Sequence, residues 1–281
     1  MSSPVGYHAL VTSPDTEEAC RVRPPSKLLL LLEGRALGEL VTTLLLRPLL
    51  RRLESGDGHP VLILPGFMAG DFSTRPLRRF LRDLGYAAHG WALGRNLGPR
   101  GDLEQRMGER LTELFERHGR TVSLLGWSLG GVYARVLANR SPDQVRSVIS
   151  PGSPLNGDPQ STNSARLFEF VTGKRIADID PERLAEVRRT PPVPTTSIFS
   201  RTDGITAWQA SIEEEGPQAE SVEVPGSHLG LGFNPLVFCV IADRLAQPEG
   251  CWRPFFRPGV VHPPGLGRPE EARIDATVDS G

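Results

Sequence analysis

A serine between two glycines has a spacing that supports covalent chemistry. The run Gly126-Trp127-Ser128-Leu129-Gly130 matches Gly-x-Ser-x-Gly, which places a serine on a sharp turn between a strand and a helix. Glycines at both positions remove Cβ atoms that would clash in this turn. Chance gives about 0.2 such matches in a chain this rich in Gly and Ser, so the motif is meaningful only if a strand precedes it and a helix follows it. An apolar run precedes the motif and a helical pattern follows it, so Ser128 is the predicted nucleophile.

A serine hydroxyl becomes a nucleophile when a base takes its proton, and the usual base is histidine. Only His228, of six histidines, follows a predicted strand near the end of the alternating pattern. Glycines on both sides let its loop reach over the serine. The others lie in polar segments, before or inside strands, or at a helix end: His8, His59, His89, His118 and His262. His228 is the predicted base, and a structural histidine is the alternative.

The base in turn needs a carboxylate that orients it. Asp203 is the acidic residue of the loop that follows the predicted strand Thr195–Phe199. The next acids, at 213–215, fall on a predicted solvated helix. Asp203 is therefore the predicted acid, and an Asx turn is the alternative role.

An acyl-transfer intermediate also needs two hydrogen-bond donors for its oxyanion. The N–H of Leu129, directly after the serine, is the first predicted donor. The second is the N–H of Phe67, in the loop Leu64-Pro65-Gly66-Phe67-Met68 after the first predicted strand. An ordinary Pro-Gly turn is the alternative for this loop.

Apolar runs alternate with helical patterns along the chain. The predicted strands are Val61–Leu64, Tyr86–Trp91, Val122–Leu125, Val145–Ile149, Thr195–Phe199 and Ser221–Val224. Helical stripes fall between them, for example Leu77, Phe80, Leu81 and Leu84. This alternation predicts the α/β class, with a mainly parallel sheet and helices on both faces.

The flanking segments depart from that pattern. We expect a flexible segment at 1–25, one α/β domain at 26–257, and a flexible Pro- and Gly-rich tail at 258–281. Within the domain, 151–192 is the predicted cap, with weak helices near Ser164–Val171 and Pro181–Arg188.

A leucine-rich helix is predicted at 26–52, with Ser26 as its N-cap and a kink at Pro48. Charged residues interrupt its leucine runs, so no stretch of about 18 apolar residues could span a membrane. The helix packs on the core, or it docks on lipid or on another copy of the chain.

Composition excludes several classes of function. The formal net charge is −1, which provides no strong field for nucleic acid or an anionic membrane. The three cysteines, Cys20, Cys239 and Cys251, have no metal-ligand spacing, so we expect reduced thiols and neither metal nor cofactor. The first 23 residues lack a signal-peptide pattern, which favours a cytoplasmic protein.

These motifs together resemble the lipase- and esterase-like serine hydrolases of the α/β-hydrolase superfamily. The resemblance covers about residues 60–247 and rests on Leu-Pro-Gly-Phe (64–67), Gly-Trp-Ser-Leu-Gly-Gly (126–131), Gly-Ser-Pro (152–154), Ser-Arg-Thr-Asp-Gly (200–204) and Gly-Ser-His (226–228). The order Ser, Asp, His is also that of the superfamily. It implies triad roles for Ser128, Asp203 and His228, and oxyanion roles for Phe67 and Leu129. Many lipases carry His-Gly where this chain has Pro65-Gly66.

The superfamily contains esterases, lipases, thioesterases and acyltransferases, so the resemblance alone does not choose the substrate. The first hypothesis is hydrolysis of a carboxylic ester in a small-molecule or lipid-like substrate. The expected substrate-binding residues are Met68, Phe72, Trp127, Leu155 and Leu167, and Phe67, Phe168 and Phe170 could line the same slot, which favours an apolar acyl group. Such a set is also typical of core packing. A thioesterase or an acyltransferase would use the same triad. A non-catalytic binding protein that kept the fold is the third possibility.

Overall fold

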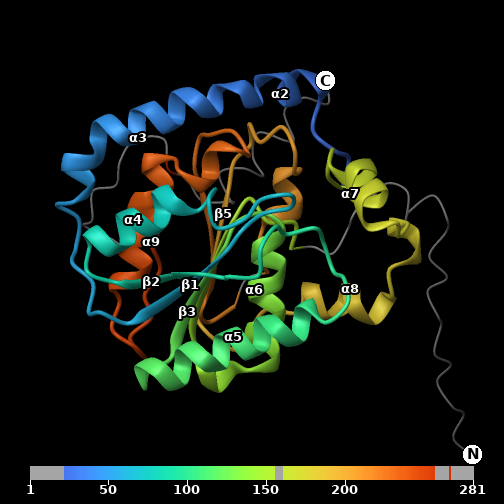
Figure 1. The fold of residues 1–281 in the computed structure, drawn as a ribbon. Coiled ribbons are helices and arrows are strands. Elements are labelled where there is room, and N and C mark those ends of the chain that lie inside the picture. Colours follow the sequence, from blue (N-terminus) through green and yellow to red (C-terminus); the bar gives the residue numbers. More distant parts are fainter. Residues whose placement is uncertain (1–21, 156–160, 215, 257–265, 267–281) are drawn as a thin grey trace, which may run out of the picture.

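The computed structural model describes residues 22–155, 161–214, 216–256 and 266, and a parallel sheet forms its centre (Figure 1). The strands are β1 (Pro60–Leu64), β2 (Ala87–Gly90), β3 (Val122–Gly126), β4 (Val145–Pro151), β5 (Thr195–Phe199) and β6 (Ala219–Glu223). They lie in the order β2-β1-β3-β4-β5-β6, and every neighbouring pair is parallel. The predicted α/β class with a parallel sheet is confirmed.

Helices cover both faces of this sheet (Figure 1). The α-helices are α2 (Lys27–Leu31), α3 (Ala36–Leu50), α4 (Arg75–Asp83), α5 (Leu103–His118), α6 (Leu129–Arg140), α7 (Ala165–Thr172), α8 (Pro181–Arg188) and α9 (Pro235–Ala246). Short 3-10 helices are η1 (Leu32–Arg35), η2 (Pro142–Gln144), η4 (Ile176–Asp178), η5 (Trp208–Ser211) and η6 (Gly230–Gly232). The helices α7 and α8 lie within the predicted cap segment.

Alternation along the strands divides the core into two layers. Val61 and Ile63 of β1 pack with α4 and α9, whereas Leu62 and Leu64 pack with α5 and α6. Successive side chains of a strand point to opposite faces, so a strand buried on both sides must be apolar throughout. This requirement explains the continuous apolar run of β1, in which every residue is buried.

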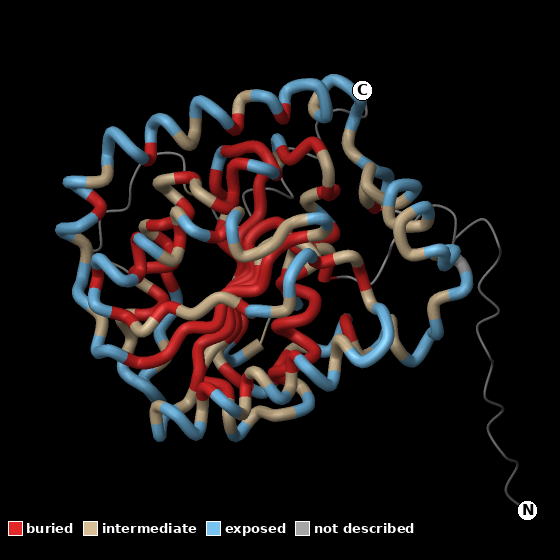
Figure 2. The backbone as a smooth tube through the Cα atoms, viewed as in Figure 1, coloured by how far each residue is buried: buried red, intermediate tan, exposed pale blue. Residues whose placement is uncertain are grey.

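The leucine-rich N-terminal stretch forms α2, η1 and α3 rather than one regular helix. The Ser26 side chain accepts a hydrogen bond from the Leu29 N–H, as an N-cap does, and Pro48 lies inside α3. Ala36, Thr43 and Leu50, seven residues apart, are buried on the inner side of α3. Its outer side is exposed along most of its length (Figure 2). In the part of the chain that the structure describes, no helix is long and apolar enough to cross a membrane.

The predicted flexible segments at 1–25 and 258–281 lie largely outside the described residues, and Cys20 lies outside them too. Cys239 and Cys251 are free thiols in the structure. The cytoplasmic location inferred from the sequence stays a prediction.

Candidate active site

The turn between β3 and α6 holds Ser128 in an unusual conformation. Its backbone has φ 56° and ψ −123°, a region that non-glycine residues occupy at a cost of about 1–3 kcal/mol. A Cβ at Gly130 would lie 2.2 Å from the Leu64 carbonyl oxygen, and one at Gly126 would lie 2.2 Å from the Gly130 oxygen. Both glycines of the motif are therefore required by close backbone contacts. The Ser128 N–H also donates to the Pro151 oxygen at 2.9 Å, which anchors the turn to β4.

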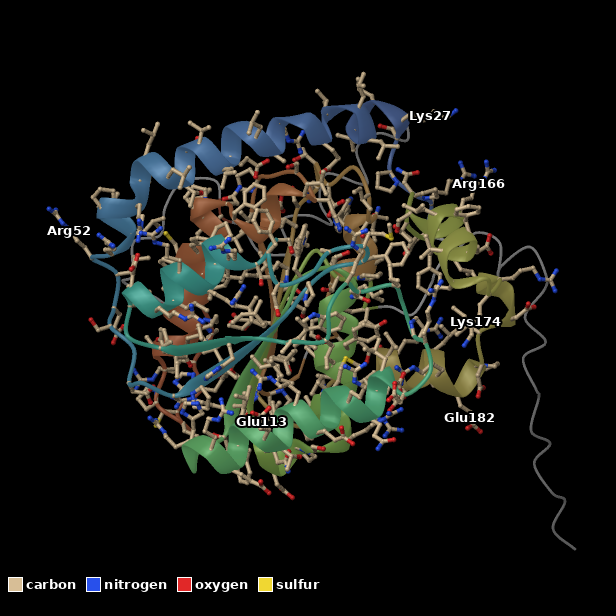
Figure 3. The ribbon with its side chains drawn as sticks, in the orientation of Figure 1. Lys27, Arg52, Glu113, Arg166, Lys174 and Glu182 are labelled. Carbon is tan, nitrogen blue, oxygen red and sulfur yellow. The ribbon has the colours of Figure 1, made fainter. Side chains whose placement is uncertain are left out.

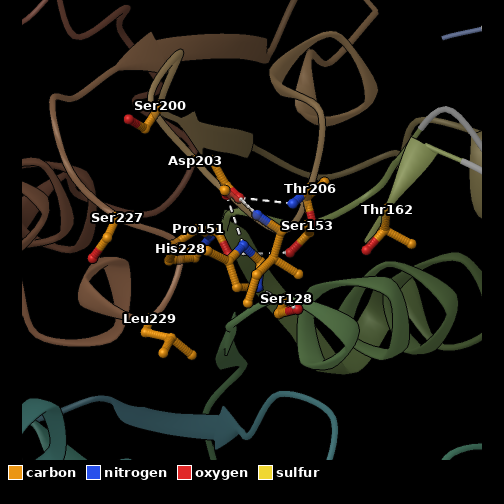
Figure 4. Close-up of polar contacts among 12 residues, drawn as sticks. Ser128, Pro151, Ser153, Thr162, Ser200, Asp203, Thr206, Ser227, His228 and Leu229 are labelled. Carbon is orange, nitrogen blue, oxygen red and sulfur yellow. Dashed lines mark hydrogen bonds and ion pairs between the residues drawn. The ribbon is translucent and has the colours of Figure 1, made fainter. Parts of the chain in front are cut away.

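Three side chains meet beside this turn (Figure 4). Ser128 Oγ lies 2.9 Å from His228 Nε2, and His228 Nδ1 lies 2.7 Å from Asp203 Oδ2. The three residues follow β3, β6 and β5, and carboxyl ends of parallel strands share one edge of a sheet. A carboxylate only accepts hydrogen bonds, so Nδ1 donates to Asp203 and Nε2 is left to accept the serine proton.

Asp203 is fixed by its own loop. Its Oδ1 accepts hydrogen bonds from the N–H groups of Ile205 at 2.8 Å and Thr206 at 2.7 Å. The other oxygen, Oδ2, is thereby directed at His228. Asp203 and His228 are each only 3 % exposed, so water does not compete for this contact.

The charge around His228 favours its protonated form. Burial is the largest single influence and lowers the pKa of the imidazole, but the carboxylates of Asp203 and Glu33 outweigh it and raise the pKa above the usual 6.5. An imidazolium is thus stabilised at this place. The arrangement can take a proton from Ser128 and hold it while negative charge develops on the group that the serine attacks.

The predicted oxyanion loop runs against the serine. A Cβ at Gly66 would lie 3.3 Å from the Ser128 Cβ, so only glycine allows this approach without a shift. Buried Asn96 supports the loop, because its Nδ2 donates to the Pro65 oxygen at 2.8 Å and its own carbonyl accepts from the Met68 N–H at 2.7 Å. The backbone bonds found among the described residues of this region use the N–H groups of neither Phe67 nor Leu129. Both could serve a ligand.

A cavity of about 690 Å³ opens at Ser128. Its apolar lining includes Phe67, Leu129, Val132, Phe168, Ile179, Leu184 and Val187, and charged residues such as Glu104, Lys174 and Arg183 line another part. Phe168 comes from α7 and Leu184 from α8, so the predicted cap segment supplies one side of the cavity. A volume of this size suits a small-molecule ligand.

Comparison with proteins of known structure identifies the fold. No protein-family model and no curated protein matches the chain. Among solved structures, Aspergillus fumigatus lipase B is similar with a TM-score of 0.54 and 18% identity, over 75% of this chain and 58% of that one. The mature form of Bacillus licheniformis lipase BlEst2 is similar with a TM-score of 0.52 and 16% identity, over 70% of this chain and 95% of that one. The chain has the α/β-hydrolase fold.

None of the five predicted substrate-binding residues is among the residues that line the cavity of this α/β-hydrolase fold. Phe72 is 80% exposed and stacks with Arg75, while Met68 and Leu167 are partly exposed on the surface. Leu155 is buried in the core, and the Trp127 indole donates to the His228 carbonyl at 3.1 Å. Their contact with a substrate stays a prediction.

A second Ser-His-Asp set lies at the opposite edge of the sheet. His59 contacts Asp57 through Nδ1 and Ser123 through Nε2, with distances of 2.5 and 2.9 Å. The side chains repeat the order of the first set, but Ser123 lies inside β3 and is only 1% exposed. A substrate cannot reach Ser123, and the exposed Asp57 is paired with Arg120 and Arg146, so this set is a structural polar network.

The N-terminal helical stretch contributes residues that the sequence analysis missed. Buried Glu33 accepts hydrogen bonds from the N–H groups of Gly204 at 2.7 Å, His228 at 2.9 Å and Leu229 at 2.8 Å. One carboxylate thus holds the loop of Asp203 and the loop of His228 together.

Glu39 and Arg35 of the same helical stretch also bind the loop that carries His228. Glu39 accepts from the N–H and hydroxyl of Ser227, and Arg35 donates to the Gly226 carbonyl at 2.9 Å. The only signal in the sequence was the occurrence of acids inside a leucine-rich helix, where an acid that turns inward needs buried partners.

Proposed function

We propose that this protein is a serine hydrolase that cleaves a carboxylic ester with an apolar acyl group. The observation that carries the proposal is the hydrogen-bonded series Asp203–His228–Ser128, whose serine lies at a cavity with apolar residues on its wall. The fold similarity to two lipases agrees with it. Ser128, His228 and Asp203 would be nucleophile, base and orienting acid.

The geometry supports a two-stage reaction. Ser128 Oγ bonds to the acyl carbon while its proton passes to His228 Nε2, and the N–H groups of Phe67 and Leu129 would hold the oxyanion. The intermediate then releases the alcohol, which takes the proton from His228. Water, deprotonated by His228, attacks the acyl-serine, and the acid leaves as Ser128 regains its proton.

A panel of p-nitrophenyl esters of graded acyl length tests this proposal on the purified chain. We expect turnover, together with labelling of Ser128 by a fluorophosphonate that mass spectrometry locates. Much faster cleavage of acyl-thioesters would instead identify a thioesterase or acyltransferase. An unlabelled Ser128 and no turnover would leave a non-catalytic binding protein.

Glu33→Gln should slow the reaction and shift its pH profile. The amide nitrogen would face the Leu229 N–H, and an unsatisfied buried donor costs about 1–3 kcal/mol of stability. The loops of Asp203 and His228 would then be held less firmly, so we expect kcat to fall about tenfold. Glu33 raises the pKa of His228, and only neutral His228 acts as a base. The acid limb of kcat/KM, with its midpoint above 6.5 in the wild type, should therefore move to lower pH.

Glu39→Gln is the matched control for this experiment. It removes a carboxylate from the same helical stretch, but Glu39 is not among the groups that shift the pKa of His228. Its acid limb should stay where the wild type has it. An equal shift in both variants would show that a general loss of packing, and not the Glu33 charge, moves the profile.

A further inference from the structure

The outer side of the N-terminal helical stretch, residues 27–52, is apolar. Ten large apolar side chains are exposed there, and we call them the leucine face: Leu28, Leu30, Leu31, Leu32, Leu37, Val41, Leu44, Leu45, Leu46 and Leu49. Leu31 is 79% exposed and Leu45 is 75% exposed. Proteins that stay monomeric in water rarely expose so many neighbouring apolar side chains without a function.

The leucine face cannot turn inward, because the opposite side of the same stretch is hydrogen-bonded to the body of the protein. Glu33 and Glu39 hold the loops around Asp203 and His228, and Thr43 donates to the Phe233 carbonyl. Arg47 and Arg51 pair with Asp83 of α4. Rotation of the helix would break all of these contacts, so the leucine face stays outside.

Positive charge lies near the leucine face. Lys27 and Arg52 lie at the two ends of the stretch (Figure 3), and α4, which Asp83 joins to Arg47 and Arg51, carries exposed Arg75 and Arg79. Residues 27–52 and 72–83 contain nine basic and three acidic residues, whereas the whole chain has a net charge of −1. The three acids point inward or are paired, and the same is true of Arg35, Arg47 and Arg51, which contact the Gly226 carbonyl and Asp83. The exposed basic side chains of these two segments include Lys27, Arg52, Arg75 and Arg79. The balanced composition therefore conceals a local basic surface.

We propose that the leucine face binds an anionic lipid surface. A helix lying in a membrane interface buries an apolar side among the acyl chains while basic residues at its rim meet anionic headgroups. The leucine face and its arginines and lysine provide both parts. Pairing of two copies through this face would bring the two basic rims together, which like-charge repulsion opposes.

Binding there would set the candidate active site close to the lipid. The inner side of the same stretch contacts the His228 and Gly204 N–H groups through Glu33. A helix is only about 10 Å across, so these loops lie roughly one helix diameter below the surface. The binding itself needs no turnover, so it stands or falls separately from the proposed hydrolysis.

Co-sedimentation of the full-length Ser128→Ala chain with lipid vesicles tests the proposal. We expect binding to phosphatidylcholine–phosphatidylglycerol vesicles that exceeds binding to pure phosphatidylcholine and that weakens as salt is added. Replacing Leu37, Leu44 and Leu45 together by Gln should lower the partition coefficient by about tenfold or more. These side chains are exposed, and circular dichroism would check that each variant keeps its fold.

Phe170→Gln is the matched control, because Phe170 is 86% exposed on α7, outside the leucine face. It should bind as the parent does. Equal binding to neutral and anionic vesicles, or a loss with Phe170→Gln but not with the leucine variant, would overturn the proposal. So would a chain that binds no vesicles but sediments as a dimer, with the leucine variant a monomer, since a second copy would then cover the face.

Discussion

Ser128→Ala should reduce kcat by about 10⁶-fold, the scale found when a triad serine is removed from a serine hydrolase. The proposed acyl bond forms on Ser128 Oγ, and His228 Nε2 lies 2.9 Å from this oxygen to take its proton. Alanine keeps the Cβ and removes only the hydroxyl, so the strained turn and its anchor to β4 are preserved. KM and the melting temperature should change little. Initial rates with the best ester of the panel, and thermal unfolding, measure these effects.

Ser123→Ala is the control that the molecule itself offers. It removes a hydroxyl from the second Ser-His-Asp set, where Ser123 is buried and His59 Nε2 lies 2.9 Å from its oxygen. A lost buried hydrogen bond should lower stability by about 1–3 kcal/mol, whereas kcat per folded molecule should stay unchanged. A wild-type rate for Ser128→Ala, or an equal loss in both variants, would contradict the proposed nucleophile.

The strands and the three candidate triad residues could be predicted because their signals are local. Each observed strand begins and ends within two residues of its prediction. The clearest signal is that of β1, where burial on both faces requires a continuous apolar run. Ser128, Asp203 and His228 each follow one of these strands. Because the strands are parallel, the loops that follow them lie at one edge of the sheet, so the three residues could be expected to lie close together.

Other parts of the site depend on contacts that no local pattern encodes. Glu33 meets His228 across 195 positions of the chain, and neither residue's neighbours reveal the other. Asn96 supports the loop at Pro65 from a segment without helical or strand periodicity. The cavity wall from α7 and α8 depends on how the predicted cap segment folds against the sheet. The sequence therefore suggested Phe67 and Phe168, which line the cavity, but not Ile179, Leu184 or Val187.

Asp203→Asn should lower kcat/KM by about 10⁴-fold, the scale of the same change in a serine protease. Two N–H groups, from Ile205 and Thr206, point at Oδ1, so the amide oxygen of Asn would remain there. Its NH₂ group would then face His228 Nδ1. That nitrogen would have to accept, and the imidazole proton would move to Nε2, where it opposes proton transfer from Ser128. The turn and the oxyanion loop would be unchanged.

The pH profile separates this explanation from simple unfolding. Asp203 raises the pKa of His228, so the residual activity of Asp203→Asn should show its acid limb at lower pH than the wild type. Asp57→Asn makes the same change beside His59 and should leave kcat and the profile of the folded protein unaltered. Fluorophosphonate labelling of Ser128 should slow in parallel with ester turnover, because both need the base. A loss smaller than about tenfold in Asp203→Asn would mean that Asp203 does not set the His228 tautomer.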